Sequence, residues 1–201
     1  MRRLTVPLSL LLLAAPARAQ ERVPDDEARA LAKLITVAAA KKITPPLAIA
    51  PDTDKPFAKR KDEYGALFLP DKRLTAERLR GAGKELVPVA ILWTHQLVPV
   101  AGDKRLPVEK LQKFSVKVKE EERMLFVCFL AARKGPKGEP ELVLLSKDRT
   151  PLLTLPLQKA GQKQKLPVEY LVSVEGDDRA HLTLQLLGEY RARLTLGVQA
   201  E

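Results

Sequence analysis

The stretch His181-Leu-Thr-Leu-Gln-Leu-Leu-Gly-Glu-Tyr-Arg-Ala-Arg-Leu-Thr-Leu-Gly-Val198 decides the fold class. Leu182, Leu184 and Leu186 alternate with polar residues, and from Tyr190 onward apolar residues again occupy every second position. Successive side chains of a strand point to opposite faces of its sheet, so this period predicts two strands, each with one apolar face.

Similar runs occur through most of the preceding chain. Residues 114–118 and 168–174 alternate in the same way, whereas 86–93 and 124–133 are apolar at nearly every position, which predicts strands buried on both faces. About nine short strands separated by turns predict a mainly β protein, an antiparallel β-sandwich or a partly closed barrel. Four prolines in or near these runs should mark sheet edges, strand starts or bulges: Pro88, Pro99, Pro156 and Pro167.

One N-terminal α-helix is predicted over residues 25–43. Acidic residues follow Pro24, the apolar residues Leu31, Leu34, Ile35 and Ala38 have helical spacing, and Lys41 and Lys42 would lie in the last turn. The expected organisation is therefore an N-terminal helical segment at 20–43, a Pro-, Asp- and Lys-rich connector at 44–63 and a β domain at 64–201. A short helix is also possible between Leu74 and Arg80, with Thr75 as its cap.

Residues 1–19 have the pattern of a secretory signal peptide. Two arginines precede a leucine-rich run, and Ala17-Arg18-Ala19 provides small residues at the cleavage site, before Gln20. Since the apolar run is too short to span a bilayer, we expect export to the periplasm or the extracellular space, with no transmembrane segment left after cleavage.

Charge and cysteine content limit the function further. The net charge of +10 becomes about +7 when the three arginines of the signal are removed, and basic proteins associate with anionic partners. Low aromatic content, 4%, together with the predicted export argues against nucleic-acid binding. The single cysteine, Cys128, lies in an apolar run; it can form no intrachain disulfide and is expected to be buried.

No motif predicts a catalytic, metal or cofactor site. The two histidines, His95 and His181, are far apart in the sequence, and the acidic turns at Asp52-Thr-Asp54 and Glu175–Asp178 are typical of ordinary turns as well as of calcium loops. We therefore predict a protein that is not an enzyme and that needs no cofactor.

The best candidate contacts for an anionic partner are Arg133, Lys134 and Lys137, which flank a predicted hairpin turn; a plainly solvated turn is the alternative interpretation. The leading hypothesis is an exported, non-enzymatic interaction module that binds an envelope protein or an anionic surface component through a sheet edge or this turn. The first alternative is a carrier or sensor of an apolar ligand held between helix and sheet. The second is a hydrolase with an unrecognised site.

The sequence also contains a short internal echo. Leu106-Pro-Val-Glu109 and Leu166-Pro-Val-Glu169 each precede a predicted strand, so a duplicated hairpin and a chance similarity are both open interpretations.

Overall fold

The computed structural model describes residues 21–118, 120–145, 147–176 and 178–199. The predicted signal peptide lies outside these residues. The two helices are α1 (Asp25–Ala39) and α2 (Ala76–Arg80), with a 3₁₀ turn at Val108–Lys110. No helix of the described chain is long and apolar enough to cross a membrane.

The strands form two antiparallel sheets. The larger sheet has the order β1 (Glu21–Arg22), β2 (Phe57–Lys61), β3 (Tyr64–Pro70), β4 (Val87–His95), β8 (Glu121–Lys134), β9 (Pro140–Leu145), β10 (Pro151–Pro156), and β7 (Gln112–Val118) also pairs with β8. The smaller sheet has the order β12 (Val168–Glu175), β13 (Arg179–Leu186), β14 (Tyr190–Val198), β5 (Leu97–Ala101), β6 (Lys104–Arg105), and β11 (Gln158–Lys159) also pairs with β14.

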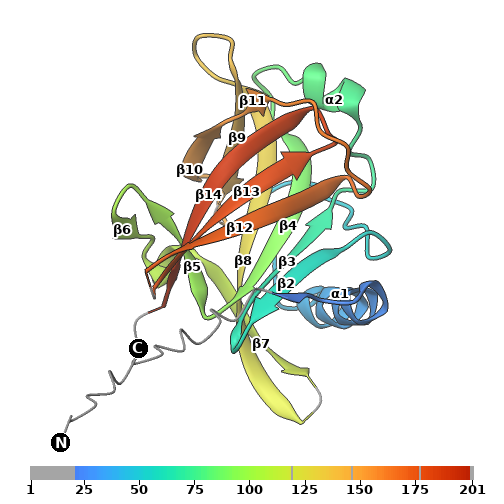
Figure 1. Cartoon of the computed structure of the whole chain (residues 1–201), viewed down its shortest axis with the longest axis vertical. Coiled ribbons are helices and arrows are strands. Elements are labelled where there is room, and N and C mark those ends of the chain that lie inside the picture. The colour runs from blue at the N-terminus through green and yellow to red at the C-terminus, as the bar shows by residue number, and fades with distance from the viewer. Residues whose placement is uncertain (1–20, 119, 146, 177, 200–201) are drawn as a thin grey trace, which may run out of the picture.

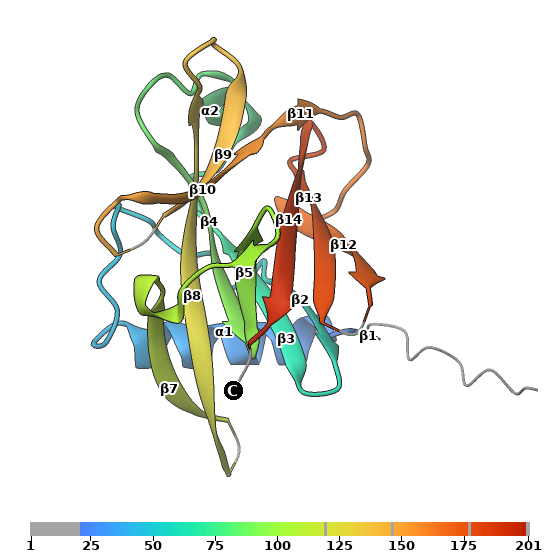
Figure 2. The same cartoon turned by 90° about the vertical axis from the view of Figure 1, so that its left-hand side faces the viewer.

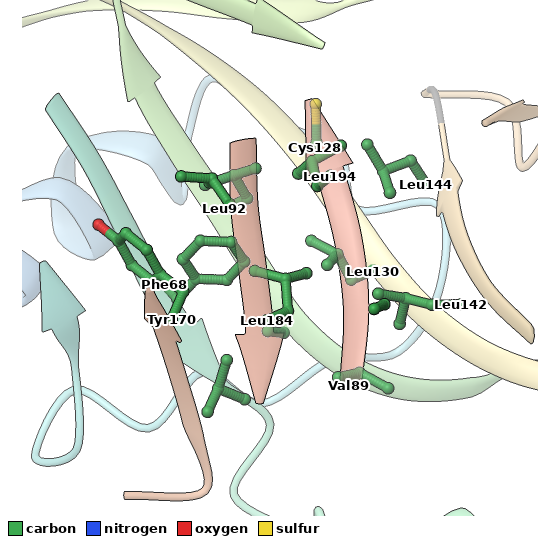
Figure 3. Packing of buried hydrophobic residues seen from close by; sticks show 14 of the residues in the cluster. Phe68, Val89, Leu92, Cys128, Leu130, Leu142, Leu144, Tyr170, Leu184 and Leu194 are labelled. Carbon is green, nitrogen blue, oxygen red and sulfur yellow. The ribbon is translucent and has the colours of Figure 1, made fainter. Parts of the chain in front are cut away.

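The two sheets pack face to face, with β12, β13 and β14 in front of the larger sheet in Figure 1. The predicted mainly β, antiparallel fold is confirmed, and the arrangement is sandwich-like with no closed barrel. The core between the sheets contains leucines from both of them around Phe68 and Tyr170 (Figure 3).

Helix α1 covers the other face of the larger sheet and makes a third layer. Its buried residues Ala28, Ala32, Ile35 and Ala39 belong to a second apolar cluster with side chains of β3, β4, β7 and β8. Strand β8 therefore has core on both sides, with Cys128 and Leu130 in one cluster and Phe129 in the other. This explains why residues 124–133 show no alternation.

The structure differs from the sequence-based expectations at the N-terminal segment. Helix α1 ends at Ala39, where the Ala39 carbonyl accepts hydrogen bonds from the N–H groups of Lys42 and Ile43, so Lys41 and Lys42 follow the helix rather than forming its last turn. The range expected to be a connector contains β2, whose Phe57 and Ala58 are buried. The described residues form fourteen strands instead of the expected nine, and several of the additional ones, such as β1, β6 and β11, are only two residues long.

Two of the four prolines occupy positions where a residue without a backbone donor is expected, and the two copies of the internal echo can be compared. Pro88 lies at a register shift in β4, and Pro156 ends the edge strand β10, as expected for a residue without a ladder donor. The two copies of the echo adopt different structures, since Val108 begins a 3₁₀ turn and Val168 begins a strand.

Candidate functional site

The candidate site lies at one end of the sandwich, at the top of Figures 1 and 2, and we call it the basic end. It consists of three segments that are distant in the sequence: residues 76–86, 133–139 and 158–163. Their cations are Arg78, Arg80, Lys84, Arg133, Lys134, Lys137, Lys159 and Lys163, and their acids are Glu77, Glu85 and Glu139. Cations therefore dominate this surface.

Helix α2 provides the first segment. The hydroxyl of Thr75 accepts a hydrogen bond from the N–H of Arg78, which caps the helix as the sequence predicts. Buried Leu79 anchors the helix to the core, so the guanidinium of Arg80 points outward and pairs with Glu189 at 3.3 Å.

The β8–β9 hairpin provides the second segment, with all three cations that the sequence identifies. The N–H of Lys134 donates to the carbonyl of Gly83 at 2.6 Å, which fixes the hairpin beside the loop after α2. Arg133 is half-buried and its Nε lies 3.1 Å from Glu141, so its charge is compensated within the protein. Lys134 and Lys137 are exposed.

The third segment is held against the turn between β13 and β14. The N–H of Ala160 donates to the carbonyl of Glu189, and the N–H of Gln162 donates to that of Gly188. Gly188 has a φ of +71°, and a Cβ there would lie 2.5 Å from the Gln162 carbonyl oxygen, so the close approach requires glycine.

Helix α2, the third segment and the turn before β14 line an open hollow of about 680 Å³ at the basic end. Its lining combines the Arg80–Glu189 ion pair with exposed Lys159, the backbone of Ala160 and Gly161, and Tyr190. No described carboxylate lies within 4.0 Å of the ammonium groups of Lys84, Lys134, Lys137, Lys159 or Lys163, so these five cations are available to an anion.

The two histidines have different surroundings, which their positions in the sequence do not reveal. His95 Nδ1 lies 2.9 Å from the carbonyl oxygen of Met124. His181, in contrast, lies between Glu175, whose Oε2 is 2.7 Å from Nε2, and Thr195, whose Oγ1 is 2.9 Å from Nδ1. The contact between His181 and Thr195 could have been predicted from the register of the β13–β14 hairpin, in which the two residues lie directly opposite each other.

The Glu175–His181–Thr195 row has the order of groups that nucleophilic catalysis uses. It lies on the outer face of the smaller sheet, and none of these three residues lines the hollow at the basic end. The carboxylate is largely exposed to water, with 65% of the Glu175 side-chain surface accessible. The described row is therefore a surface hydrogen-bond network.

The acidic turn at Asp52–Asp54 is held by contacts within the protein. Asp52 Oδ1 accepts the N–H of Asp54, and the two carboxylates pair with Lys55 and Lys33. The described residues contain no group of three or more His, Cys, Asp or Glu side chains placed to hold a metal ion.

Comparison of the chain with protein-family models, with curated proteins and with solved structures finds no match.

Proposed function

We propose that this protein is an exported, non-enzymatic binding module that contacts an anionic envelope component through its basic end. The observation that carries the proposal is the gathering of lysines without a described ion-pair partner on three distant segments at one end of the sandwich, where Lys159 lines an open hollow. Scattered surface lysines would solubilise any protein, but a cluster in which cations outnumber acids raises the local positive potential.

The geometry favours an extended anion over a small enclosed ligand. The hollow is open, and the exposed Lys84, Lys137 and Lys163 belong to three separate segments of the basic end. A polymer or a lipid surface that presents several phosphate or sulfate groups can contact all of these cations at once, with about 1 kcal/mol for each cation near an anionic surface.

An apolar-ligand carrier has weaker support. The interface between α1 and the larger sheet is filled, since Ala32 and Ile35 are 0% and 1% exposed. A second hollow, at the open mouth between the two sheets beside Lys59 and Tyr170, has a volume of only about 30 Å³, whereas ligand pockets usually need a few hundred Å³, about 300 or more.

The proposal is tested with vesicles of phosphatidylglycerol, vesicles of phosphatidylcholine, and heparin as a soluble polyanion. The mature chain should bind heparin or the anionic vesicles and should not bind the phosphatidylcholine vesicles. The triple variant Lys84→Gln, Lys137→Gln, Lys163→Gln should bind on the order of a hundredfold more weakly, as the loss of three cations implies. Equal binding to both kinds of vesicle, or none to any probe, would contradict the proposal.

A matched control removes the same charge elsewhere. Lys41, Lys110 and Lys113 are exposed, lie outside the basic end and have no described carboxylate within ion-pair distance. Replacing all three with Gln should change the affinity much less.

A further inference from the structure

Strand β12 is an edge strand that lacks the usual protection. Within the described chain it pairs only with β13, in a continuous register from Val168–Leu186 to Glu175–Arg179 without a bulge. Its sequence, Val-Glu-Tyr-Leu-Val-Ser-Val-Glu, contains no proline and no lysine. A long, regular, partly apolar edge is a template for pairing with another strand.

The other sheet edges of the described chain are protected. Strands β1, β6 and β11 are two residues long, and β10 begins and ends with proline and has a register shift. Strand β7 carries lysines, and the Lys42 ammonium donates to the carbonyl of Ser115 on it. The absence of such devices on β12 therefore singles it out.

Strand β12 also exposes apolar side chains on both of its faces. Leu171 is 57% exposed and Val174 is 48% exposed, and together they account for two of the five large hydrophobic residues that are exposed in the described structure. Leu171 shares the outer face of the sheet with Ser173, and Val174 shares the inner face with buried Tyr170. A strand added along this edge would cover both.

We propose that β12 pairs antiparallel with β12 of a second copy of this chain, with Leu171 on the two-fold axis. A symmetric pair of identical strands matches residues whose numbers share the same parity, so groups that face outward in one copy meet groups that face outward in the other. The result is a continuous sheet across the two copies.

Charge and side-chain type fit this register. Leu171 lies opposite Leu171, Glu169 opposite Ser173, and Val168 opposite Val174, so no like charges are directly opposed. Glu175 reaches the chain just before β12 of the second copy, where Lys165 is exposed. Moving the axis one residue to Val172 would place Glu169 opposite Glu175, which is repulsive.

The test is the mass of the mature chain in solution, measured by light scattering after size-exclusion chromatography at micromolar concentration. Wild type should have twice the chain mass, and Leu171→Lys, which places two cations on the axis, should be a monomer with an unchanged circular dichroism spectrum. Val37→Lys is the matched control, because Val37 is 75% exposed on α1, and it should remain a dimer.

A second measurement covers the case in which Leu171→Lys does not fold. Leu171→Cys should form a disulfide-linked dimer on mild oxidation, and Val37→Cys should not, since Cys128 is buried and cannot react in either protein. A monomeric wild type, or equal cross-linking of both variants, would overturn the proposal. Because none of these residues belongs to the basic end, failure of the dimer would leave the proposed anion binding intact, and the converse also holds.

Discussion

The hydroxyl of Tyr170 on β12 donates a hydrogen bond of 2.7 Å to the carbonyl oxygen of Ala66 on β3, and so joins the two sheets through their core. The ring lies between Phe57 and Phe68, with centroid distances of 4.9 and 5.1 Å. Burial raises the pKa of Tyr170, while a backbone hydrogen bond from Lys59 partly opposes that rise. The neutral phenol is therefore a fixed link between the layers.

Tyr170→Phe should lower the free energy of unfolding by about 1–2 kcal/mol, because the ring contacts remain and only the hydrogen bonds of the buried hydroxyl, to Ala66 and from Lys59, are lost. Urea unfolding measures this change. Tyr190→Phe is the control, since Tyr190 is also buried and its hydroxyl has no hydrogen-bond partner among the described residues. Equal losses in the two variants would show that the link to Ala66 contributes nothing specific.

Asp71 makes stability depend on acid pH. The residue is 2% exposed, and burial of the carboxyl raises its pKa. Hydrogen bonds from the Arg73 side chain and from the N–H groups of Ala50 and Arg73, together with the charge of Arg73, outweigh burial and hold the pKa below its ordinary value. A carboxyl whose pKa is lower in the folded state stabilises the fold above the pKa of the unfolded chain, about 3.9. This stabilisation is lost as the pH falls through the lower, folded pKa.

Asp71→Asn should therefore cost about 1–3 kcal/mol at pH 7 and less at low pH, where the wild-type carboxyl is itself protonated. Thermal unfolding of both proteins between neutral and strongly acidic pH measures the difference. A gap between them that stays constant over this range would refute the linkage.

The thiol of Cys128 should be unreactive in the folded protein. It is 1% exposed, and burial raises its pKa to about 12, so almost no thiolate forms at pH 8. Ellman's reagent should label it at the rate of unfolding and quickly in urea. Rapid labelling of the native protein would contradict the described core.

Export is a prediction of the sequence alone. Expression in a bacterial host with a general secretory pathway should give a mature protein that begins at Gln20, as N-terminal sequencing or intact mass can establish. A product that keeps residues 1–19 and stays in the cytoplasm would remove the basis for an envelope partner.

Local patterns predict most of the strands but not the layers. The alternation in β13 and β14 gives the inward face directly, and the unbroken apolar run in β8 indicates burial on both sides. The position of α1 on the outer face of the larger sheet depends on contacts between distant segments, which no local period encodes.

The candidate site was predictable only in part for the same reason. Arg133, Lys134 and Lys137 are recognisable from a hairpin turn. Lys84 and Lys163 reach the same end of the sandwich because neighbouring residues are fixed there by long-range backbone hydrogen bonds, from Lys134 to Gly83 and from Gln162 to Gly188. For Arg133 the sequence predicts too much: it indicates an exposed cation, but in the structure Arg133 pairs with Glu141 across the hairpin, which compensates its charge.

The most direct test of the basic end is the affinity for fluorescent heparin as a function of salt, measured for wild type and for the two triple Gln variants. Each cation that contacts a polyanion contributes roughly one to the slope of log affinity against log salt. We predict that Lys84→Gln, Lys137→Gln, Lys163→Gln lowers the slope by about three, while Lys41→Gln, Lys110→Gln, Lys113→Gln leaves it close to that of wild type. Equal slopes for the two variants would mean that the positive charge acts only in bulk and that the basic end is not a binding site.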